Sequence, residues 1–446
     1  MKCGRTIEVR GLALRQVNIK SKLRKRYEGV GTFTLDRKFY CDVKVVDEIM
    51  GAGKSTAAIN YINMLDSDIK VIYVTPYLSE VDRIKELCKN RNFKSPNWKK
   101  GRKIIDLKEL IKGGENVVTT HALFHNFDDE LIDMCWNMNY ILFLDEVTEV
   151  IEPHEGLKSK NDLDLFLNNY GYVDSSTGIV KWKKGVEYTG NKFASEKIHC
   201  RNGSLAYYGG GIMMWLFPIK VFNAFREVFI LTYMFSCQLQ AYYYDYLGVP
   251  YRRIYLTGDD YKNITFTGDE SERCVVKKDY SQLINIIEDN RLNRIGDKDT
   301  ALSKSWYERN KNTGGLDILR DNLTNYFINI TGKGVSHNLW TTFSDYRPYL
   351  KGKGYTKGFE SLNARATNRW RECDCVAYTV NRYLNPLIAQ FFRLADIDIN
   401  QDAYALSEML QFIWRSAIRD GKPITIYIPS SRMRRLLKNW IEENSV

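Results

Sequence analysis

The sequence lacks any uninterrupted apolar segment long enough to be a secretion signal or a membrane span. Charged residues break every apolar stretch in the first 26 residues, whereas a secretory signal needs a continuous apolar core. The two longest uncharged runs, 202–219 and 228–244, contain glycines, a proline or polar residues. Neither provides about 20 apolar residues of helix. We therefore expect no membrane partner and no export.

Closely spaced cysteine pairs are also missing. The nine cysteines are odd in number and scattered, and only Cys373 and Cys375 lie near each other. One Cys-x-Cys without a second pair is weak evidence for zinc, and scattered cysteines are typical of reduced thiols in a cytosolic protein. We find no internal repeat and no low-complexity tract, which excludes solenoids and disordered chains.

The composition is that of a large globular protein with an excess of positive charge. Of its 446 residues, 44% are hydrophobic and 27% are charged, so the chain can bury the cores of two or three domains. The formal net charge is +11. This excess favours a polyanionic partner such as nucleic acid, although a basic solvated surface gives the same count.

Short β-branched runs alternate with longer helical segments in the first half of the chain. This alternation is typical of an α/β protein with a parallel sheet covered by helices on both faces. The predicted strands are 43–49, 70–76, 116–123, 140–147 and 228–235, and the predicted helices are 54–65 and 79–89.

The rest of the chain divides into segments of different character. A basic N-terminal extension (1–40) precedes the first domain (41–265). Polar, glycine-rich and aromatic sequence at 151–226 has no clear period, and we interpret it as an insertion or a group of long surface loops. A mixed-charge connection (266–315) leads to a second α/β domain (316–446), with strands near 337–343, 374–380 and 423–429 and a helix around 404–419.

A glycine-rich segment, DEIMGAGKST at 47–56, lies between a predicted strand and a predicted helix. Backbone N–H groups of such a turn can close around phosphate oxygens, aided by the helix N-terminus. The lysine reaches the outer phosphates, and the next hydroxyl holds Mg²⁺. Glu48 replaces the first glycine of the usual eight-residue pattern. We predict a nucleotide-binding loop made of Gly51, Ala52, Gly53, Lys54, Ser55 and Thr56.

Two adjacent acids, Asp145 and Glu146, follow the apolar run at 140–144. An aspartate at the end of a strand can hold Mg²⁺ together with Ser55, and the adjacent glutamate can activate the attacking water. Taken alone, two such acids are more typical of a helix N-cap and first turn. Their combination with the upstream loop favours catalysis of hydrolysis.

These motifs resemble those of superfamily 2 helicases of the DEAD/DEAH type, and especially bacteriophage helicase-like ATPases. The resemblance covers about 400 residues and implies two RecA-like P-loop domains in tandem, with ATP and Mg²⁺ bound by the first. The segments that carry it are MGAGKST (50–56), VIYVTPYLSEVDRI (71–84), VVTTHALF (117–124), LDEVTEV (144–150), FILTYMF (229–235), WTTF (340–343), NARATN (363–368) and QFIWRSAIR (411–419).

The resemblance further implies that the second domain senses the γ-phosphate through Gln411, Arg415 and Arg419. An arginine supplied across the cleft stabilises charge on the transferred phosphoryl group, so hydrolysis becomes coupled to domain movement. The spacing departs from the usual motif, which leaves open which arginine does this. A solvated basic helix face is the alternative interpretation.

Residues at predicted strand ends are candidates for binding nucleic acid without sequence preference, because hydroxyls and backbone N–H groups bind phosphates. Taken singly, each is more typical of a turn or cap residue, and the aromatic cluster at 242–246 is better explained by packing. The candidates are Thr75, Pro76, Thr119, Thr120, His121, Thr341 and Thr342.

The sequence therefore predicts an ATP-dependent translocase or helicase acting on nucleic acid. Single-stranded or branched DNA is favoured over RNA, but the sequence leaves the choice between DNA and RNA open. The resemblance implies a role in phage replication or recombination, with proteins of those processes as partners and the host cytoplasm as location. The alternatives are a P-loop ATPase that does not unwind, such as a packaging motor or remodeller, and a nucleotide-gated nucleic-acid-binding module. A small-molecule kinase is disfavoured because its activity would not explain the second α/β domain.

Overall fold

The computed structural model describes residues 41–445 except 77, 100, 158, 208, 210, 261, 275–277 and 363–368. The N-terminal extension and the predicted motif at 363–368 therefore lie outside the described residues. The chain divides into two compact units. The larger comprises Cys41–Pro153 and Phe217–Val446, and the described part of the smaller is His154–Leu216. Within the described ranges, no helix is both long and apolar enough to cross a membrane.

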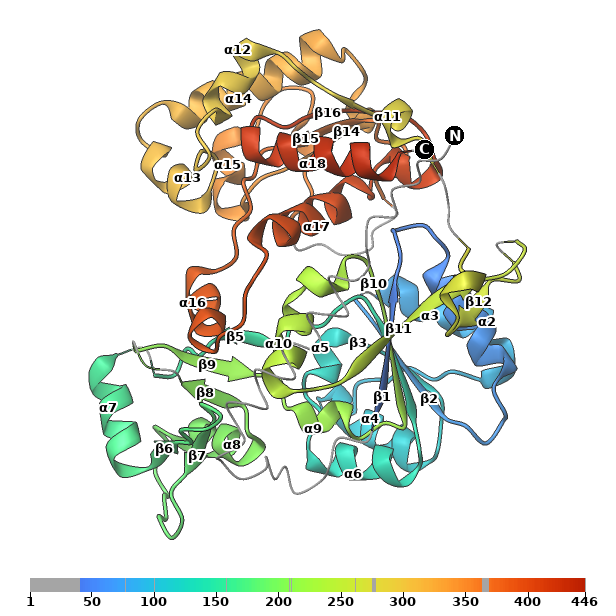
Figure 1. Cartoon of the computed structure of the whole chain (residues 1–446), viewed down its shortest axis with the longest axis vertical. Coiled ribbons are helices and arrows are strands. Elements are labelled where there is room, and N and C mark those ends of the chain that lie inside the picture. Colours follow the sequence, from blue (N-terminus) through green and yellow to red (C-terminus); the bar gives the residue numbers. More distant parts are fainter. Residues whose placement is uncertain are drawn as a thin grey trace, which may run out of the picture. The chain divides into compact units, whose positions relative to one another are not determined.

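A seven-stranded sheet forms the first lobe of the larger unit (Figure 1). All its strand pairs are parallel except β11–β12. The five predicted strands are confirmed, and two further strands, β11 and the edge strand β12, were not predicted. In spatial order the strands are β12 (Thr265–Thr267), β11 (Tyr251–Thr257), β1 (Asp42–Asp47), β10 (Glu227–Thr232), β4 (Ile141–Asp145), β2 (Val71–Thr75) and β3 (Val117–Thr120).

Helices cover this sheet because its strands are apolar on both faces. On one face, α2 (Lys54–Met64) packs its alanines and isoleucines against aromatic strand residues such as Phe143 and Phe229, whose rings stack with centroids 4.5 Å apart. The other helices of the lobe are α3 (Leu78–Leu87), α4 (Lys103–Lys112), α5 (His121–Phe124), α6 (Asp129–Asn137), α9 (Ile219–Phe222) and α10 (Leu239–Leu247).

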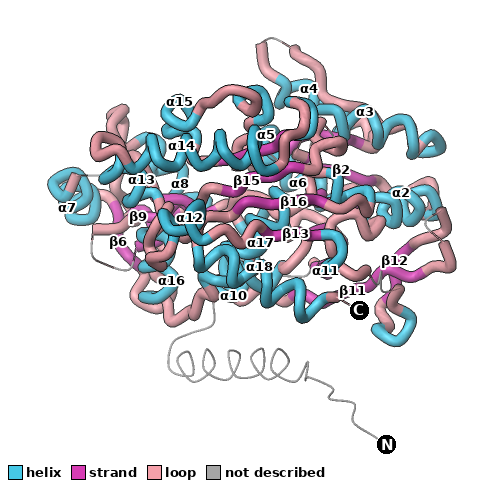
Figure 2. The backbone as a smooth tube through the Cα atoms, turned by 90° about the horizontal axis from the view of Figure 1, so that it is seen from above, coloured by secondary structure: helices cyan, strands magenta, loops and turns pink. Residues whose placement is uncertain are grey.

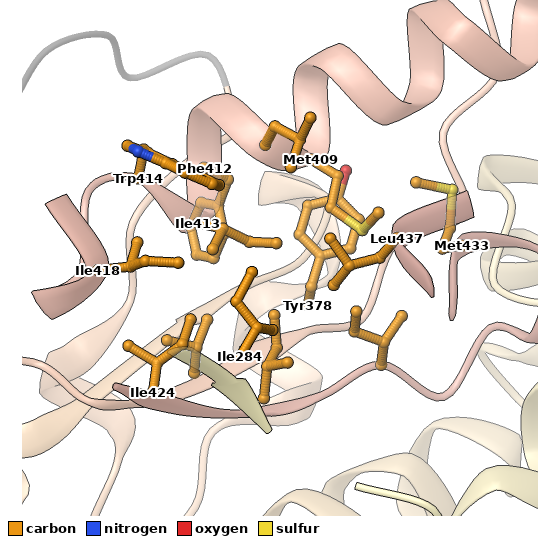
Figure 3. Close-up of a cluster of buried hydrophobic side chains, with 14 of the residues drawn as sticks. Ile284, Tyr378, Met409, Phe412, Ile413, Trp414, Ile418, Ile424, Met433 and Leu437 are labelled. Atoms are coloured by element: carbon orange, nitrogen blue, oxygen red, sulfur yellow. The ribbon is translucent and has the colours of Figure 1, made fainter. Parts of the chain in front are cut away.

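The second lobe is built on a four-stranded parallel sheet. Its order is β13 (Ile284–Ile286), β16 (Ile424–Tyr427), β15 (Cys375–Tyr378) and β14 (Asn338–Thr341). Alternate residues of β15 enter different cores. Val376 and Tyr378 pack with residues of α17 (Gln401–Ile413) and α18 (Ser431–Asn444). Figure 3 shows Tyr378 in this core with Met409 and Leu437. Cys375 and Ala377 pack with residues of α13 (Lys304–Asn310) and α14 (Gly315–Asn325). Figure 2 shows the course of these helices and of β15.

Two sequence-based expectations for the second lobe differ from the structure. The stretch predicted as a connection contains β13, an edge strand of only three residues whose Ile-Asn-Ile sequence is too short to show a period. The predicted helix at 404–419 ends early, because α17 stops at Ile413 and a separate 3₁₀ turn covers Ala417–Asp420. Ser416 breaks the helix with an extended backbone, and its hydroxyl donates to the Ile413 carbonyl at 2.6 Å.

The smaller unit forms a compact module with its own core. Phe166, Phe193 and Val180 are fully or almost fully buried in that core. Its elements are α7 (Lys160–Asn169), β6 (Gly171–Val173), β7 (Val180–Trp182), α8 (Ala194–Asn202), β8 (Leu205–Tyr207) and β9 (Met213–Leu216). Strands of three or four residues explain why the sequence showed no period there.

Candidate nucleotide-binding site

The glycine-rich loop connects β1 to α2 and has the backbone of a phosphate-binding turn. Gly51 has φ +83° and Gly53 has φ +99°, conformations that a residue with a Cβ rarely adopts. Ala52 is buried beneath the turn, and its N–H donates to the Ile49 carbonyl at 3.2 Å. This loop fits a triphosphate, because it presents backbone N–H groups and the start of α2.

Lys54 is buried, with its ammonium held inside the loop. Its Nζ donates to the carbonyl oxygens of Glu48 at 2.6 Å and Ile49 at 3.1 Å. Desolvation lowers the pKa of Lys54, and the nearby carboxylates of Glu146 and Asp145 oppose this effect. The Lys54 ammonium therefore lies within the loop and near two carboxylates, as a site for Mg²⁺ and phosphate requires.

Ser55 and Asp145 come together from different elements. The Ser55 Oγ donates to the Asp145 Oδ1 at 3.4 Å, although 90 residues separate them. Asp145 ends β4, which is separated from β1 by β10 in the sheet. A serine hydroxyl and a carboxylate are the hard oxygen ligands that Mg²⁺ prefers. These two residues fit the metal that accompanies a nucleotide.

Burial of the Asp145 carboxylate lowers the free energy of unfolding when the group is ionised. Burial raises the pKa of Asp145 from 3.8 to about 7, with the charges of Glu146 and Glu80 as further causes. A carboxyl group with a raised pKa stabilises the fold fully at low pH, and this contribution is lost as the pH rises through about 7. At about 1.4 kcal/mol per pKa unit, the upper bound is ~4 kcal/mol.

We therefore expect Asp145→Asn to raise the melting temperature of the chain without Mg²⁺ at a pH above about 7, and to change it little near pH 4. Thermal denaturation at both pH values measures this. Exposed Asp133→Asn should have no such pH-dependent effect. An increase for Asp145→Asn that is equal at both pH values would contradict the expectation.

Glu146 adopts a backbone conformation that is unusual for its residue type. Its φ is +72°, and such strain costs about 1–3 kcal/mol and concentrates at functional sites. The Glu146 N–H donates to the Leu231 carbonyl at 2.9 Å, and the Thr232 Oγ1 donates to the Glu146 Oε2 at 3.3 Å. Strand β10 thus fixes the carboxylate at the edge of the sheet next to Asp145.

Glu48 and Arg273 are site residues that sequence reasoning missed. Glu48 is buried, and its carboxylate accepts two hydrogen bonds from the Arg273 guanidinium, at 2.7 and 3.0 Å. The same residue uses its carbonyl to hold Lys54. Glu48 stands where the usual motif has glycine, so this departure was the available signal, but Arg273 lies 225 residues away and nothing local marked it.

The Glu48–Arg273 pair should be coupled energetically. We expect Arg273→Ala to lower the free energy of unfolding by about 1–3 kcal/mol, because it leaves a buried carboxylate without its charged donor. Adding Glu48→Gln should recover most of this loss, since the remaining amide carries no charge. Urea denaturation of the two single variants and the double variant measures the coupling. Strictly additive effects would contradict it.

The predicted arginines have different environments. Arg415 is buried, and its guanidinium donates to the carbonyls of Ser361 at 2.8 Å and Leu362 at 3.1 Å. Arg419 lies on the 3₁₀ turn and is half-buried. Its side chain forms no ion pair or hydrogen bond with the residues that the structure describes. Gln411 is half-buried on α17. The two arginines therefore do not share a helix face, contrary to the alternative interpretation.

The turn that carries Arg419 lies against the nucleotide-binding loop. A Cβ built on Gly51 would be 3.6 Å from the Arg419 carbonyl oxygen. Other contacts join the same lobes: the Trp440 Nε1 donates to the Tyr233 hydroxyl at 2.9 Å, and the Gln238 Nε2 to the Ser407 Oγ at 3.1 Å. Because Tyr233 directly follows Thr232, the second lobe contacts the segment that holds Glu146.

The residues predicted to bind nucleic acid separate into two groups. Thr75, Thr119, Thr341 and Thr342 are buried, and the Thr342 hydroxyl donates to the Tyr307 hydroxyl at 3.0 Å. Their side chains do not reach the surface, because the ends of these strands are covered. Half-buried are Pro76, Thr120 and His121, and the His121 Nε2 lies 3.0 Å from the Asp145 carbonyl oxygen. Contact of any of the seven residues with nucleic acid remains a prediction.

Comparisons with known proteins give one close relative and several distant structures. Residues 278–441, which include β13, match the family model of the YonV C-terminal Rossmann-like domain. Among solved structures, "XPD_APO" is 12% identical and covers 96% of this chain and 97% of its own, with a TM-score of 0.47. "Crystal Structure of DUF1998 helicase MrfA bound to DNA and AMPPNP" is 11% identical and covers 100% and 54%, with a TM-score of 0.34.

The SPbeta prophage-derived uncharacterized protein YonV of Bacillus subtilis (strain 168) is similar over nearly its whole length. The two sequences are 39% identical over 410 residues, which are 90% of this chain and 98% of that protein. The chain therefore belongs to the YonV family.

Proposed function

We propose that this chain is an ATP-dependent nucleic-acid translocase or helicase that unwinds or remodels DNA in phage-type replication or recombination. The observation that carries the proposal is the pairing of Ser55 with Asp145 at 3.4 Å, next to the strained Glu146, together with the contact between the turn of Arg419 and Gly51. The prophage origin of the Bacillus subtilis relative supports the phage role.

The side chains of the site have distinct tasks in hydrolysis. Bound ATP and Mg²⁺ supply the phosphoryl group and the divalent charge that neutralises its oxygens. Lys54 and the loop bind the phosphates, and Ser55 and Asp145 hold the metal. Glu146 orients the attacking water and accepts its proton, while Thr232 keeps the carboxylate in place.

The second lobe couples this chemistry to movement. Arg419 stabilises charge on the terminal phosphate, and Arg415 holds the backbone at 361–362. Because Tyr233 contacts Trp440 directly after Thr232, a change at the Glu146 carboxylate is transmitted to α18. Binding of ATP therefore favours one arrangement of the lobes, and its hydrolysis another. Nucleic acid bound to both lobes would be moved by this cycle.

The rate of ATP hydrolysis with and without single-stranded DNA, RNA and forked duplex tests the proposal. We expect DNA to stimulate hydrolysis by the parent and Lys54→Ala to abolish it, because the loop loses its phosphate-binding charge. Equal rates with all polymers would contradict a nucleic-acid motor. Stimulated hydrolysis without strand displacement of the fork would favour the non-unwinding ATPase. Binding of ATP and DNA without hydrolysis would favour the nucleotide-gated binding module.

A further inference from the structure

The unit His154–Leu216 contains a pocket that the nucleotide site does not use. Its volume is about 500 Å³, and it is lined by residues of β6, β7 and α8 and by Lys184, which follows β7. This size lies within the range of about 300–1,000 Å³ that is usual for ligand pockets. The lining combines basic and aromatic side chains and includes no acid: Tyr172, Lys181, Trp182, Lys184, Lys197 and Arg201.

Two of the four basic residues are already engaged within the unit. The Lys181 Nζ forms an ion pair with Asp174 at 2.6 Å. The Lys197 Nζ donates to the Tyr188 carbonyl at 3.3 Å and lies 5.6 Å from the centroid of the Trp182 ring. Their charges are therefore partly satisfied, and they form the wall of the pocket rather than its free binding groups.

Lys184 and Arg201 are the cations available to a ligand. Both are exposed, and no ion pair or hydrogen bond of their side chains is recorded with other residues that the structure describes. Both residues line the pocket but come from different segments of the chain: Lys184 follows β7, and Arg201 lies in α8. Two unneutralised cations beside one pocket favour an anion with more than one charged group, such as consecutive phosphates.

Aromatic side chains define the second property of the ligand. Tyr172 is 41% exposed. Trp182 is fixed, because its Nε1 donates to the Val186 carbonyl at 2.9 Å and its ring stacks on Tyr170 with centroids 5.5 Å apart. An exposed ring beside a rigid aromatic wall is a platform for a flat base, and stacking contributes about 1–3 kcal/mol per base.

We propose that this pocket binds single-stranded nucleic acid, with a base stacked on Tyr172 and the flanking phosphates bound by Lys184 and Arg201. The inference rests on the proposed function, to which it adds a contact outside both lobes. It requires no sequence preference, since neither stacking nor phosphate binding distinguishes the bases. The module would then hold the strand while the lobes change their arrangement.

Binding of a labelled oligothymidine to the full chain, without nucleotide and over a range of salt concentrations, tests the inference. Lys184→Ala/Arg201→Ala should weaken binding about tenfold or more and reduce the log–log salt slope by about 1.4, at ~0.7 per phosphate contact. Tyr172→Ala should also weaken binding, whereas Tyr172→Phe should not. The control Lys160→Ala/Lys192→Ala removes equal charge from the same unit but outside the pocket.

The outcomes separate this inference from the proposed function. The substituted lysine and arginine residues are all exposed, both in the pocket (Lys184 and Arg201) and in the control (Lys160 and Lys192). Their replacement should therefore leave the fold and the DNA-independent ATPase rate unchanged. Parent-like affinity and salt slope in the pocket variant overturn the inference alone. A parent that binds no nucleic acid overturns both. Competition by thymidine monophosphate as effective as by the oligomer would overturn it in favour of a mononucleotide site.

Discussion

Replacing Glu146 by glutamine should lower the rate of ATP hydrolysis by about 10²- to 10⁴-fold, the range typical for a lost general base. The amide has the size of the carboxylate and can still accept the hydrogen bond from Thr232, which lies at 3.3 Å. It cannot take a proton from water. The strained backbone at φ +72° is retained, so we expect the affinity for ATP to remain within a few-fold of the parent.

Single-turnover hydrolysis and equilibrium ATP binding measure the two parts of this expectation. Glu149→Gln is the matched control, since this exposed glutamate lies three residues further along the chain. A Glu146→Gln chain that hydrolyses ATP at the parental rate would exclude Glu146 as the base. Loss of ATP binding instead would indicate that the carboxylate supports the loop rather than the chemistry.

Replacing Arg419 by alanine should reduce hydrolysis by about 10³- to 10⁵-fold, the effect usual for an arginine that stabilises the transferred phosphoryl group. Its turn lies against Gly51, and its guanidinium is only half-buried, so its removal should leave the melting temperature nearly unchanged. Arg435→Ala, an exposed arginine of α18, is the control for loss of charge in the same lobe.

Arg415→Ala should behave in the opposite way. Two part-buried carbonyl groups, those of Ser361 and Leu362, lose their donors, so each should cost about 1 kcal/mol, the lower end of the range for a buried group left without a partner. Denaturant unfolding should therefore show a destabilised chain. Arg415→Lys should not restore it, because one ammonium does not reproduce the guanidinium fork. A stable, inactive Arg415→Ala with an active Arg419→Ala would reverse the two assignments.

Much of the first lobe could be predicted because its signals are local. Strands such as 71–75 and 141–145 are apolar on both faces, so they appear as continuous hydrophobic runs. The glycines at 51 and 53 mark the loop equally clearly, because both adopt the left-handed backbone that glycine favours. The pairing of Ser55 with Asp145 followed from the motif order and is consistent with the sheet order β1–β10–β4.

Features set by distant contacts could not be predicted. The end of α17 depends on the backbone at Ser416 and on a hydrogen bond from Ala417 N to the Cys373 carbonyl at 2.9 Å. The Arg273 partner of Glu48 lies beyond the whole first sheet in sequence. The burial of Thr75 and Thr341 depends on residues that cover the strand ends, which a single-sequence pattern does not contain.

The small unit was recognised as an insertion but not as a folded module. Its strands have three or four residues, too few for alternation to be detected. Its core depends instead on contacts among aromatic residues of α7, β7 and the segment before α8, such as Phe166 with Trp182 and Phe193. The basic and aromatic pocket arises only when β6, β7 and α8 are brought together.

The preference for ATP over ADP in the Glu146→Gln chain, with and without Arg419→Ala, tests most directly whether both lobes bind one triphosphate. We expect Glu146→Gln to bind ATP about tenfold or more tightly than ADP in the presence of Mg²⁺, since a charged donor contributes about 1.5–3 kcal/mol. Addition of Arg419→Ala should remove this preference. A preference that persists unchanged in the double variant would show that the second lobe does not contact the terminal phosphate.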